Sequence, residues 1–374
     1  MQLVDRGTIF DATAAPANRR FCSFTSALVL SDGRILVSFR AGSSKDSADE
    51  NIIIRMSADE GKTWETVYEN METVIDGVPG CWRSAGMTEL EPGRIVAEWC
   101  WFDRSEPERP LANPETQGTL PSRVFVMESL DAGRTWIKSR EVPTKPFEGI
   151  ATTGPILKLA NGDLAVQYEA WKAYDDPAPG EHHAIIRISA DGGYTFEPDV
   201  IVAHDDDARI FYWDQRLDVA PDTGEVIALL WSHDRDLQQD INVHVATGTP
   251  DGKTWSEPAD AGFAGQISSP LCLGDGKVLA AWVHRHNPAT LRAVLSNDFG
   301  RTWDAEDALV FYESGSGQES GMAGKREFAD YWEDMARWSF GHAEPARLPN
   351  GDVFIAFYGG NPEAMSMYWV RIAL

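Results

Sequence analysis

The chain has 374 residues, of which 43% are hydrophobic and 14 are tryptophan, so it can build a large apolar core and is not a disordered chain. Its formal net charge of −25 argues against nucleic acid or an anionic membrane as the main partner, and no apolar stretch reaches the ~20 residues of a membrane-spanning helix. The four cysteines lie far apart without a CxxC pair, which argues against a disulfide framework or a zinc site built from cysteines.

The chain begins with MQLVDRGTIF, which lacks a basic segment followed by an apolar run. A secretory signal peptide needs both features. We therefore expect a cytoplasmic protein, or a secreted one if a leader has been removed. The segment QLVDRGTIF itself is expected to pair, as a strand, with the final segment MSMYWVRIAL, which closes the ring and covers the strand edges.

Six glycine turns, each lying between two apolar runs, recur along the chain. Each reads as a β-hairpin whose glycine supplies positive φ, and a third apolar run such as NIIIRMS and a short fourth run follow. Four antiparallel strands repeated six times predict an all-β fold, a six-bladed β-propeller that spans residues 1–374 as one domain. The turn glycines, at spacings of 60, 69, 62, 52 and 75 residues, are Gly33, Gly93, Gly162, Gly224, Gly276 and Gly351.

A second repeat, SxDxGxTW or a close variant, follows the third strand of each predicted blade except the sixth. The aspartate can accept backbone N–H groups inside the turn, and the glycine relaxes the backbone. We interpret the phrase as a structural turn between strands three and four, not as a catalytic motif. Its copies are SADEGKTW at 57–64, SLDAGRTW at 129–136, SADGGYTF at 189–196, SNDFGRTW at 296–303 and the shorter TPDGKTW at 249–255.

In an antiparallel meander these turns and the hairpins lie on one face, and every long segment lies on the other. The long segments are 40–51, 100–122, 170–183, 203–214 and 305–341, and seven of the eight histidines fall on their face. Functional residues concentrate in such loops, so we place the site there. The segment 305–341 is too long for a plain connection, and the helical spacing of Phe328, Tyr331, Trp332 and Met335 predicts a partly helical lid over the site.

Aligning the blades on their turn glycines indicates one candidate residue. The side chain nine residues before each glycine should lie at the start of the innermost strand, and in blade six this residue is His342, with Glu344 two residues later on the same strand face. A histidine with a carboxylate neighbour is a plausible general base with its orienting partner. The alternative is a buried structural pair. A flanking carboxylate would raise the pKa of His342.

The repeated phrase is the Asp-box, and together with the six-blade layout it resembles the sialidase superfamily over nearly the whole chain. The resemblance implies that Arg40 binds substrate and that Asp46, six residues on in RAGSSKD, is the acid/base, with a raised pKa. It further implies that Arg292, in NPATLRAVLSNDFG, binds a substrate carboxylate, and that Arg235, in LLWSHDR, assists.

The sequence also departs from the pattern of this superfamily. The first-blade arginine is absent from FTSAL, although Arg19 and Arg20 lie upstream, and His342 stands where the nucleophilic tyrosine is expected. The helper glutamate of blade four is replaced by Asp214 or Gln215, and we assign Asp214 to substrate binding. Another tyrosine, such as Tyr331, would have to supply the nucleophile if the usual double displacement operates.

Three functions fit these residues. The first is an exo-acting glycoside hydrolase on a glycan carrying sialic or uronic acid, in which Arg292 and Arg235 hold the carboxylate and Asp46 protonates the leaving oxygen. The second is a polysaccharide lyase on a uronate with His342 as base, and the third is a non-catalytic glycan-binding propeller. We expect a glycan partner, no cofactor and no metal, because the acidic run HDDDAR at 204–209 reads as a solvated loop more readily than as a site for a hard cation.

Overall fold

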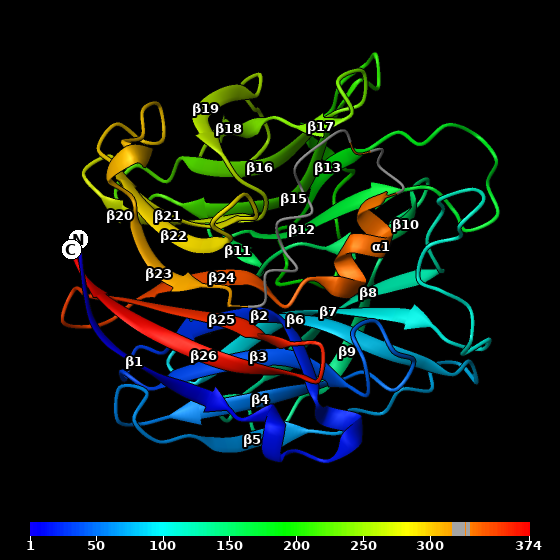
Figure 1. The fold of residues 1–374 in the computed structure, drawn as a ribbon, viewed down its shortest axis with the longest axis horizontal. Helices are drawn as coiled ribbons and strands as arrows, with labels where there is room; N and C mark the ends of the chain where they lie inside the picture. The colour runs from blue at the N-terminus through cyan, green and yellow to red at the C-terminus, as the bar shows by residue number, and fades with distance from the viewer. Residues whose placement is uncertain (316–325, 327–329) are drawn as a thin grey trace.

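The computed structural model describes residues 1–315, 326 and 330–374, and in these the chain forms five antiparallel sheets set around a common centre (Figure 1). The predicted all-β propeller arrangement is confirmed. The colours of Figure 1 follow one another around the ring, so sheets that are consecutive in sequence are neighbours in space. Within the described residues, no helix is long and apolar enough to cross a membrane.

The largest sheet consists of two four-stranded meanders. One contains β24 (Phe340–Arg347), β25 (Val353–Asn361), β26 (Ala364–Ala373) and β1 (Gln2–Phe10), and the other contains β2 (Phe21–Val29), β3 (Ile35–Gly42), β4 (Asn51–Ser57) and β5 (Glu65–Glu69). A single parallel bridge between Phe21 and Met365 joins them. Strands β1 and β26 pair from Gln2 opposite Ala373 to Phe10 opposite Met367, so the first and last strands lie side by side as expected.

The other four sheets follow in chain order. The second has β6 (Gly80–Glu91), β7 (Arg94–Asp103), β8 (Ser122–Ser129) and β9 (Ile137–Val142), and the third has β10 (Glu148–Thr152), β11 (Leu157–Lys158), β12 (Leu164–Trp171), β13 (His183–Ser189) and β14 (Val200–Ala203). The fourth has β15 (Ile210–Val219), β16 (Val226–Asp234), β17 (Gln239–Asp240), β18 (Asn242–Gly248) and β19 (Ala259–Ala264). The fifth has β20 (Ser268–Gly274), β21 (Lys277–His284), β22 (Thr290–Ser296) and β23 (Leu309–Glu313).

The helical elements are short. Among the residues that the structure describes, three 3-10 turns occupy η1 (Ala12–Ala14), η2 (Ala17–Arg19) and η3 (Ala305–Asp307), and an α-helix, α1 (Asp330–Arg337), precedes β24. Tyr331 of α1 is fully buried, and the helix packs against aromatic side chains of the fourth sheet through Tyr331 and Trp332.

The core lies between the sheets. Every residue of β3 and β16 is buried, because each of these second strands is covered on both faces by neighbouring sheets. This explains why such strands read in the sequence as continuous apolar runs rather than as alternating ones. The buried clusters accordingly combine residues of adjacent sheets, such as Leu36 and Trp99, or Ala228 and Ile186.

The repeated turns are held by a network within each copy. In the first copy, Ser57 Oγ donates to Asp59 Oδ1 (2.9 Å) and accepts from the Gly61 N–H (2.8 Å). The backbone N–H and the hydroxyl of Thr63 donate to the two oxygens of Asp59, at 2.8 and 2.7 Å. The same four hydrogen bonds recur in the copies that begin at 129, 189 and 296.

Two of the turn glycines show why a side chain is excluded there. Gly61 has φ +91°, and a Cβ on it would lie 2.8 Å from Trp369 of the meander beside it. Gly300 has φ +79°, and its Cβ would lie 2.6 Å from Ile227 of the preceding sheet. The turn therefore serves as a contact between adjacent sheets, in agreement with its structural interpretation.

The innermost strands carry the feature that positions the site. Strand β2 touches β6 and β24, and β20 touches β15 and β24, so these first strands surround the centre. Several of them have a register shift near the end that faces the long loops. Phe24, Asp214 and His342 lie at three of these irregularities with φ of 54°, 44° and 46°. A bulge of this kind re-aims a side chain, which here turns toward the centre of the ring.

Candidate active site

A cleft lies at this end of the inner strands, lined by residues of the first four sheets, of α1, and by Ile267 and Arg285, which flank strands of the fifth sheet. Much of its wall is aromatic, and charged side chains converge between the rings. An apolar pocket with a few convergent polar groups is the usual form of a small-molecule site. Its aromatic lining consists of Phe24, Phe102, Trp171, Trp213, Trp231, Trp332, Trp338 and Tyr358.

One side of the cleft is a buried ion-pair network. Arg40, at the end of β3, and Arg83, on β6, both donate to Asp46 Oδ1, at 2.7 and 2.6 Å. Both also pair with Glu50, each at 3.1 Å. Burial alone would raise the pKa of Asp46, but Arg83, Arg40 and Lys45 outweigh it and hold that pKa well below its usual range. The raised pKa expected for Asp46 is therefore wrong, because a second arginine reaches it from the neighbouring sheet.

Several polar atoms in the lining have no hydrogen-bond partner within the protein. The Arg40 side chain is fully buried, and its Nη1 is one of these atoms. Others are Thr153 Oγ1 and His182 Nδ1. Buried polar groups are normally paired, so groups left unpaired at the wall of a cleft indicate that a polar ligand binds there. A guanidinium among them favours an anionic ligand group.

The cleft contains a second carboxyl group, that of Asp214, whose pKa is shifted in the opposite direction. Asp214, at the bulge of β15, accepts from Arg216 Nε at 3.0 Å, and its backbone N–H donates to Glu169 Oε2 at 2.7 Å. Burial raises the pKa of Asp214 to about 7, because Arg216 only partly opposes the burial and the Glu169 carboxylate adds to it. Asp214 is thus protonated for part of the time near neutral pH, whereas Asp46 stays ionised.

His342 lies between these groups with a defined tautomer. Arg216 Nη2 lies 2.9 Å from His342 Nδ1, and the imidazole packs on the Phe24 ring with centroids 4.2 Å apart. Because a guanidinium only donates, Nδ1 must accept, and the proton of the neutral ring is on Nε2. Burial, followed by Arg216 and Arg40, lowers the pKa of His342 well below its ordinary value. The expected rise in this pKa is wrong, since the nearest charges are cations.

Glu344 does not orient His342 as expected. The register shift between Gly341 and Glu344 separates the two residues, and Glu344 Oε2 instead accepts from Ser269 Oγ at 2.9 Å and lies 3.6 Å from Arg216 Nη1. Its pKa is raised by burial. Glu344 therefore belongs to the ion-pair support behind the cleft, and the sequence missed Arg216, which stands between the two residues.

The structure brings Arg40, Asp46, Asp214 and His342 into the lining of one cleft, but not the other two predicted arginines. Arg235 lies in a separate surface hollow, where it covers the Phe211 ring and donates to the Ala208 carbonyl.

Arg292 is also outside this lining. It is in the middle of β22, opposite Trp282, and donates to the Thr290 hydroxyl. Arg285, which follows β21, reaches the cleft instead. It donates to the Gln266 side chain at 2.7 Å and lies over the Trp338 ring.

The tyrosine considered as a nucleophile, Tyr331, is also placed elsewhere. Its hydroxyl donates to Asp240 at 2.8 Å beneath α1, and burial raises its pKa. The tyrosine of the cleft is Tyr358 on β25, 3.4 Å from Lys45 Nζ through its hydroxyl. From the predicted lid, α1 contributes Trp332 and Met335 to the cleft, whereas Phe328 and most of 314–327 lie outside the described residues.

The turn count gives a sequence signal for Arg83, which was overlooked, and for Asp214, which was named only through the superfamily resemblance. Arg83 and Asp214 both lie ten residues before their turn glycines, Gly93 and Gly224, instead of nine. The turn of blade four is one residue longer than that of blade one, and blade two has a second register shift beside its turn, so a fixed count of nine passes over both residues.

No family model and no curated protein sequence matches this chain. Its fold is similar to a Dyadobacter fermentans protein of unknown function (TM-score 0.72, 18% identity, covering 100% of this chain and 99% of that one). It is also similar to the Ruminococcus gnavus intramolecular trans-sialidase (TM-score 0.64, 10% identity, 98% and 97% covered). The Penicillium chrysogenum alpha-L-arabinanase gives a TM-score of 0.62 at 13% identity, with 99% and 98% covered. At these identities the likeness shows a shared propeller fold.

Proposed function

We propose that this chain is a sialidase-like glycoside hydrolase that removes a terminal sugar carrying a carboxylate. The observation that carries the proposal is a single cleft that holds two carboxyl groups in different surroundings. Asp46 is paired with two arginines, which lower its pKa, whereas Asp214 is paired with Arg216 alone and burial raises its pKa. Glycosidases need such a pair, one to protonate the leaving oxygen and one to act on the other side of the sugar. The similar structures support the class, because they include a trans-sialidase in complex with oseltamivir carboxylate and an arabinanase complexed with arabinobiose.

The six-blade count is part of this proposal. It follows if the two meanders of the largest sheet, joined by one bridge, are counted as separate blades. The repeated turn is then the Asp-box of the sialidase fold. With this count, the inner strand of each blade begins near the cleft, and the segment that contains α1 is a lid over it.

In the proposed mechanism Asp214 is the general acid. A pKa near the working pH lets it donate its proton to the glycosidic oxygen as the bond breaks. Asp46 remains a carboxylate and stabilises the positive charge that develops on the sugar ring. A water molecule then adds to the anomeric carbon and gives its proton to the Asp214 carboxylate, which releases the free sugar and restores the acid. The two aspartates thus exchange the roles of acid and substrate ligand that the sequence led us to expect.

His342 serves as a hydrogen-bond donor in this mechanism, not as a base. Its Nδ1 already accepts from Arg216, so the Nε2–H is the group it offers to a substrate oxygen. Taking up a second proton would place a cation beside a guanidinium, which the lowered pKa of His342 reflects. The lyase alternative, which needs His342 as base, loses its main support.

The substrate carboxylate binds at the arginine side of the cleft. Arg40 offers the unpaired Nη1, and Arg83 and Lys45 lie beside it. A guanidinium matches a carboxylate in shape and charge, and the aromatic walls suit the apolar face of a sugar ring.

The proposal is tested with chromogenic sialosides and uronides, comparing the parent protein with Asp214→Asn. The proposed hydrolase releases the chromophore without an unsaturated sugar product, and Asp214→Asn loses this activity. A product absorbing in the near ultraviolet would indicate a lyase. Tight binding of an acidic sugar without turnover of any substrate in the panel would indicate the non-catalytic binding protein.

A further inference from the structure

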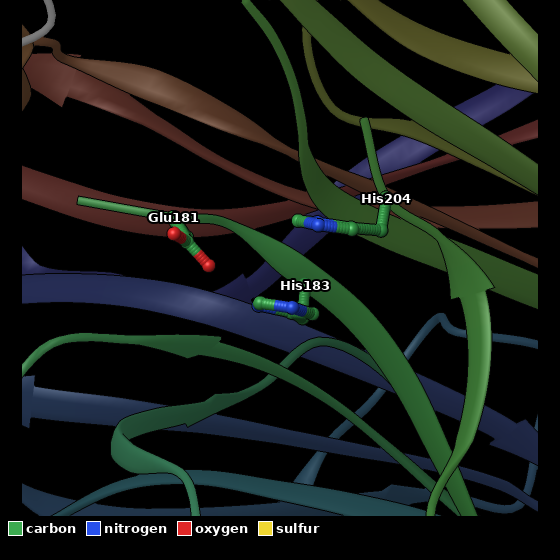
Figure 2. Close-up of side chains that lie close together, drawn as sticks. All are labelled: Glu181, His183 and His204. Carbon is green, nitrogen blue, oxygen red and sulfur yellow. The ribbon is translucent and has the colours of Figure 1, made fainter. Parts of the chain in front are cut away.

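Three side chains with metal-binding groups converge at the rim of the third sheet (Figure 2). Glu181 and His183 flank the start of β13, and His204 follows β14. Their ligand atoms all lie within 4.8 Å of one another, and the two imidazoles stack with centroids 4.0 Å apart and planes at 8°. Within the described part of the chain, no other group of three such residues has this geometry.

We propose that Glu181, His183 and His204 bind a divalent cation of the zinc type. The proposal stands on this convergence and on the hydrogen bond that fixes His204. The Nδ1 of His204 lies 3.0 Å from the His182 carbonyl, which can only accept, so Nδ1 carries the proton and Nε2 presents its lone pair. Metal-binding histidines are commonly oriented in this way by a backbone carbonyl.

A fourth ligand is within reach. Asp206 Oδ1 lies 3.9 Å from His204 Nε2, and the Asp206 side chain is fully exposed, so it is free to turn toward the cation. Four ligands at zinc distances of about 2.0–2.1 Å lie roughly 3.4 Å from one another in a tetrahedron. The spacing of up to 4.8 Å among Glu181, His183 and His204 closes if the exposed Glu181 rotates and the half-buried His183 ring turns out of the stack, because a cation binds near the plane of each imidazole.

The donor set selects the class of metal. Two imidazole nitrogens and carboxylate oxygens suit zinc and similar borderline cations, whereas calcium and magnesium prefer oxygen ligands alone. The sequence predicts no metal and a solvated loop at 204–209, but the fold places His183 beside His204 and supplies a nitrogen ligand that the local sequence does not show.

The site is coupled to the cleft through His182, which lies in the chain between two of the ligands. His182 lines the cleft and its Nε2 lies 3.2 Å from Glu169 Oε2, while Glu169 accepts the backbone N–H of Asp214. A cation bound to Glu181, His183 and His204 fixes the backbone on both sides of His182. It also fixes the His204 ring, which donates to the His182 carbonyl. The metal therefore acts as a positioning element for this wall of the cleft.

The test is calorimetric titration of zinc into the untagged, metal-free protein and three variants. We expect the parent to bind one zinc per chain. His183→Ala and His204→Ala should each lose more than the ~10–100-fold in zinc affinity that removal of an outer-shell partner costs. The matched control is His286→Ala, because His284 and His286 form another histidine pair, with centroids 5.1 Å apart, that is not part of a three-ligand cluster in the described residues. Its zinc affinity should equal that of the parent.

Thermal unfolding supplies a readout that is independent of any enzyme activity. Zinc should raise the Tm of the parent and of His286→Ala, and should leave that of His183→Ala unchanged. The proposal is overturned if the parent binds no zinc at micromolar concentration, or if folded His183→Ala and His204→Ala bind it as tightly as the parent. Loss of binding in His286→Ala alone would also overturn it. Because binding is measured without substrate, these outcomes do not depend on the glycosidase proposal.

Discussion

The two faces of the ring contrast in how their polar groups are satisfied. On the face of the repeated turns, each aspartate receives its hydrogen bonds from residues two to four positions away, as Asp59 does from Ser57 and Thr63. On the opposite face, Asp46 is paired with arginines of two different strands, and Arg40 Nη1 has no partner in the protein. The residues that repeat from blade to blade therefore build the scaffold, whereas the charged residues that do not repeat lie where the inner strands bulge.

The largest difference in activity and stability between the two faces is expected when one aspartate is replaced on each face. Asp214→Asn removes the proposed acid and should lower kcat/KM by about 10²–10⁴-fold, the usual contribution of general acid catalysis. Its stability near pH 7 should change little, because an amide replaces a carboxyl group that is partly neutral there. Steady-state kinetics and thermal unfolding measure both. Asp59→Asn should lower the thermal stability and leave kcat/KM unchanged. Equal losses of kcat/KM in the two variants would contradict the difference between the faces.

The second expectation concerns the pH dependence of the reaction. As an acid, Asp214 must be protonated, so kcat/KM should fall as the pH rises through about 7, the pKa of this group. No fall is expected near pH 4, since Asp46 is ionised well below that value. A profile of kcat/KM against pH from 4 to 9 checks whether the activity falls near pH 7 and not near pH 4. A profile that rises with pH between 5 and 7 would favour a base of the kind first assigned to His342.

Third, the two faces should lose stability at opposite ends of the pH range. Burial raises the pKa of Glu98, behind the cleft, to about 8, so its contribution is complete below the unfolded value near 4.3 and is lost as the pH rises toward 8. The Thr63 hydrogen bonds lower the pKa of Asp59, so its contribution is present above about 3.9 and is lost as the pH falls.

Denaturant unfolding of Glu98→Gln and Asp59→Asn between pH 3 and 9 separates these two contributions. Glu98→Gln should flatten only the loss of stability as the pH rises from about 4 to 8, and Asp59→Asn only the loss as the pH falls below about 4. Coincident curves for both variants and the parent would show that neither group controls the pH dependence.

A smaller effect is expected from α1, if it is the lid that we propose. Trp332 lines the cleft and packs edge-on to Trp213 at 5.7 Å between centroids. Trp332→Ala removes part of the apolar wall and should raise KM by about tenfold, equivalent to ~1.4 kcal/mol, with kcat retained. Tyr331→Phe, whose hydroxyl points away to Asp240, is the matched control and should leave KM unchanged. A fall in kcat alone would argue against a lid.

The smallest effect belongs to the turns themselves. Thr63→Val removes one hydrogen bond to Asp59 at an exposed site, so the Tm should fall by about 2 °C or less in a chain of this size, with no change in kinetics. Differential scanning calorimetry resolves such a shift. Any loss of activity in this variant would mean that the turn face communicates with the cleft.

Sequence predicted the scaffold well because its signals are local. Gly33 and the phrase at 57–64 each specify a turn from neighbouring residues alone. The cleft is not local: the low pKa of Asp46 depends on Arg83, 37 positions away, and the tautomer of His342 depends on Arg216, 126 positions away. A count along the chain also fails where a hairpin turn is one residue longer, as it is between Asp214 and Gly224.

The pairing of β1 with β26 has a consequence for folding kinetics. This contact joins the two most distant segments of the chain, so its formation costs more chain entropy than that of any other described strand pair. We therefore expect the ring to close after the individual meanders have formed. The two termini are neighbours in space (Figure 1), so a short linker can join them and a new break can be placed at the Gly162 turn. Such a circular permutant keeps every strand pair of the ring while making the closing contact a hairpin, and it should therefore refold to the same structure by a different order of events.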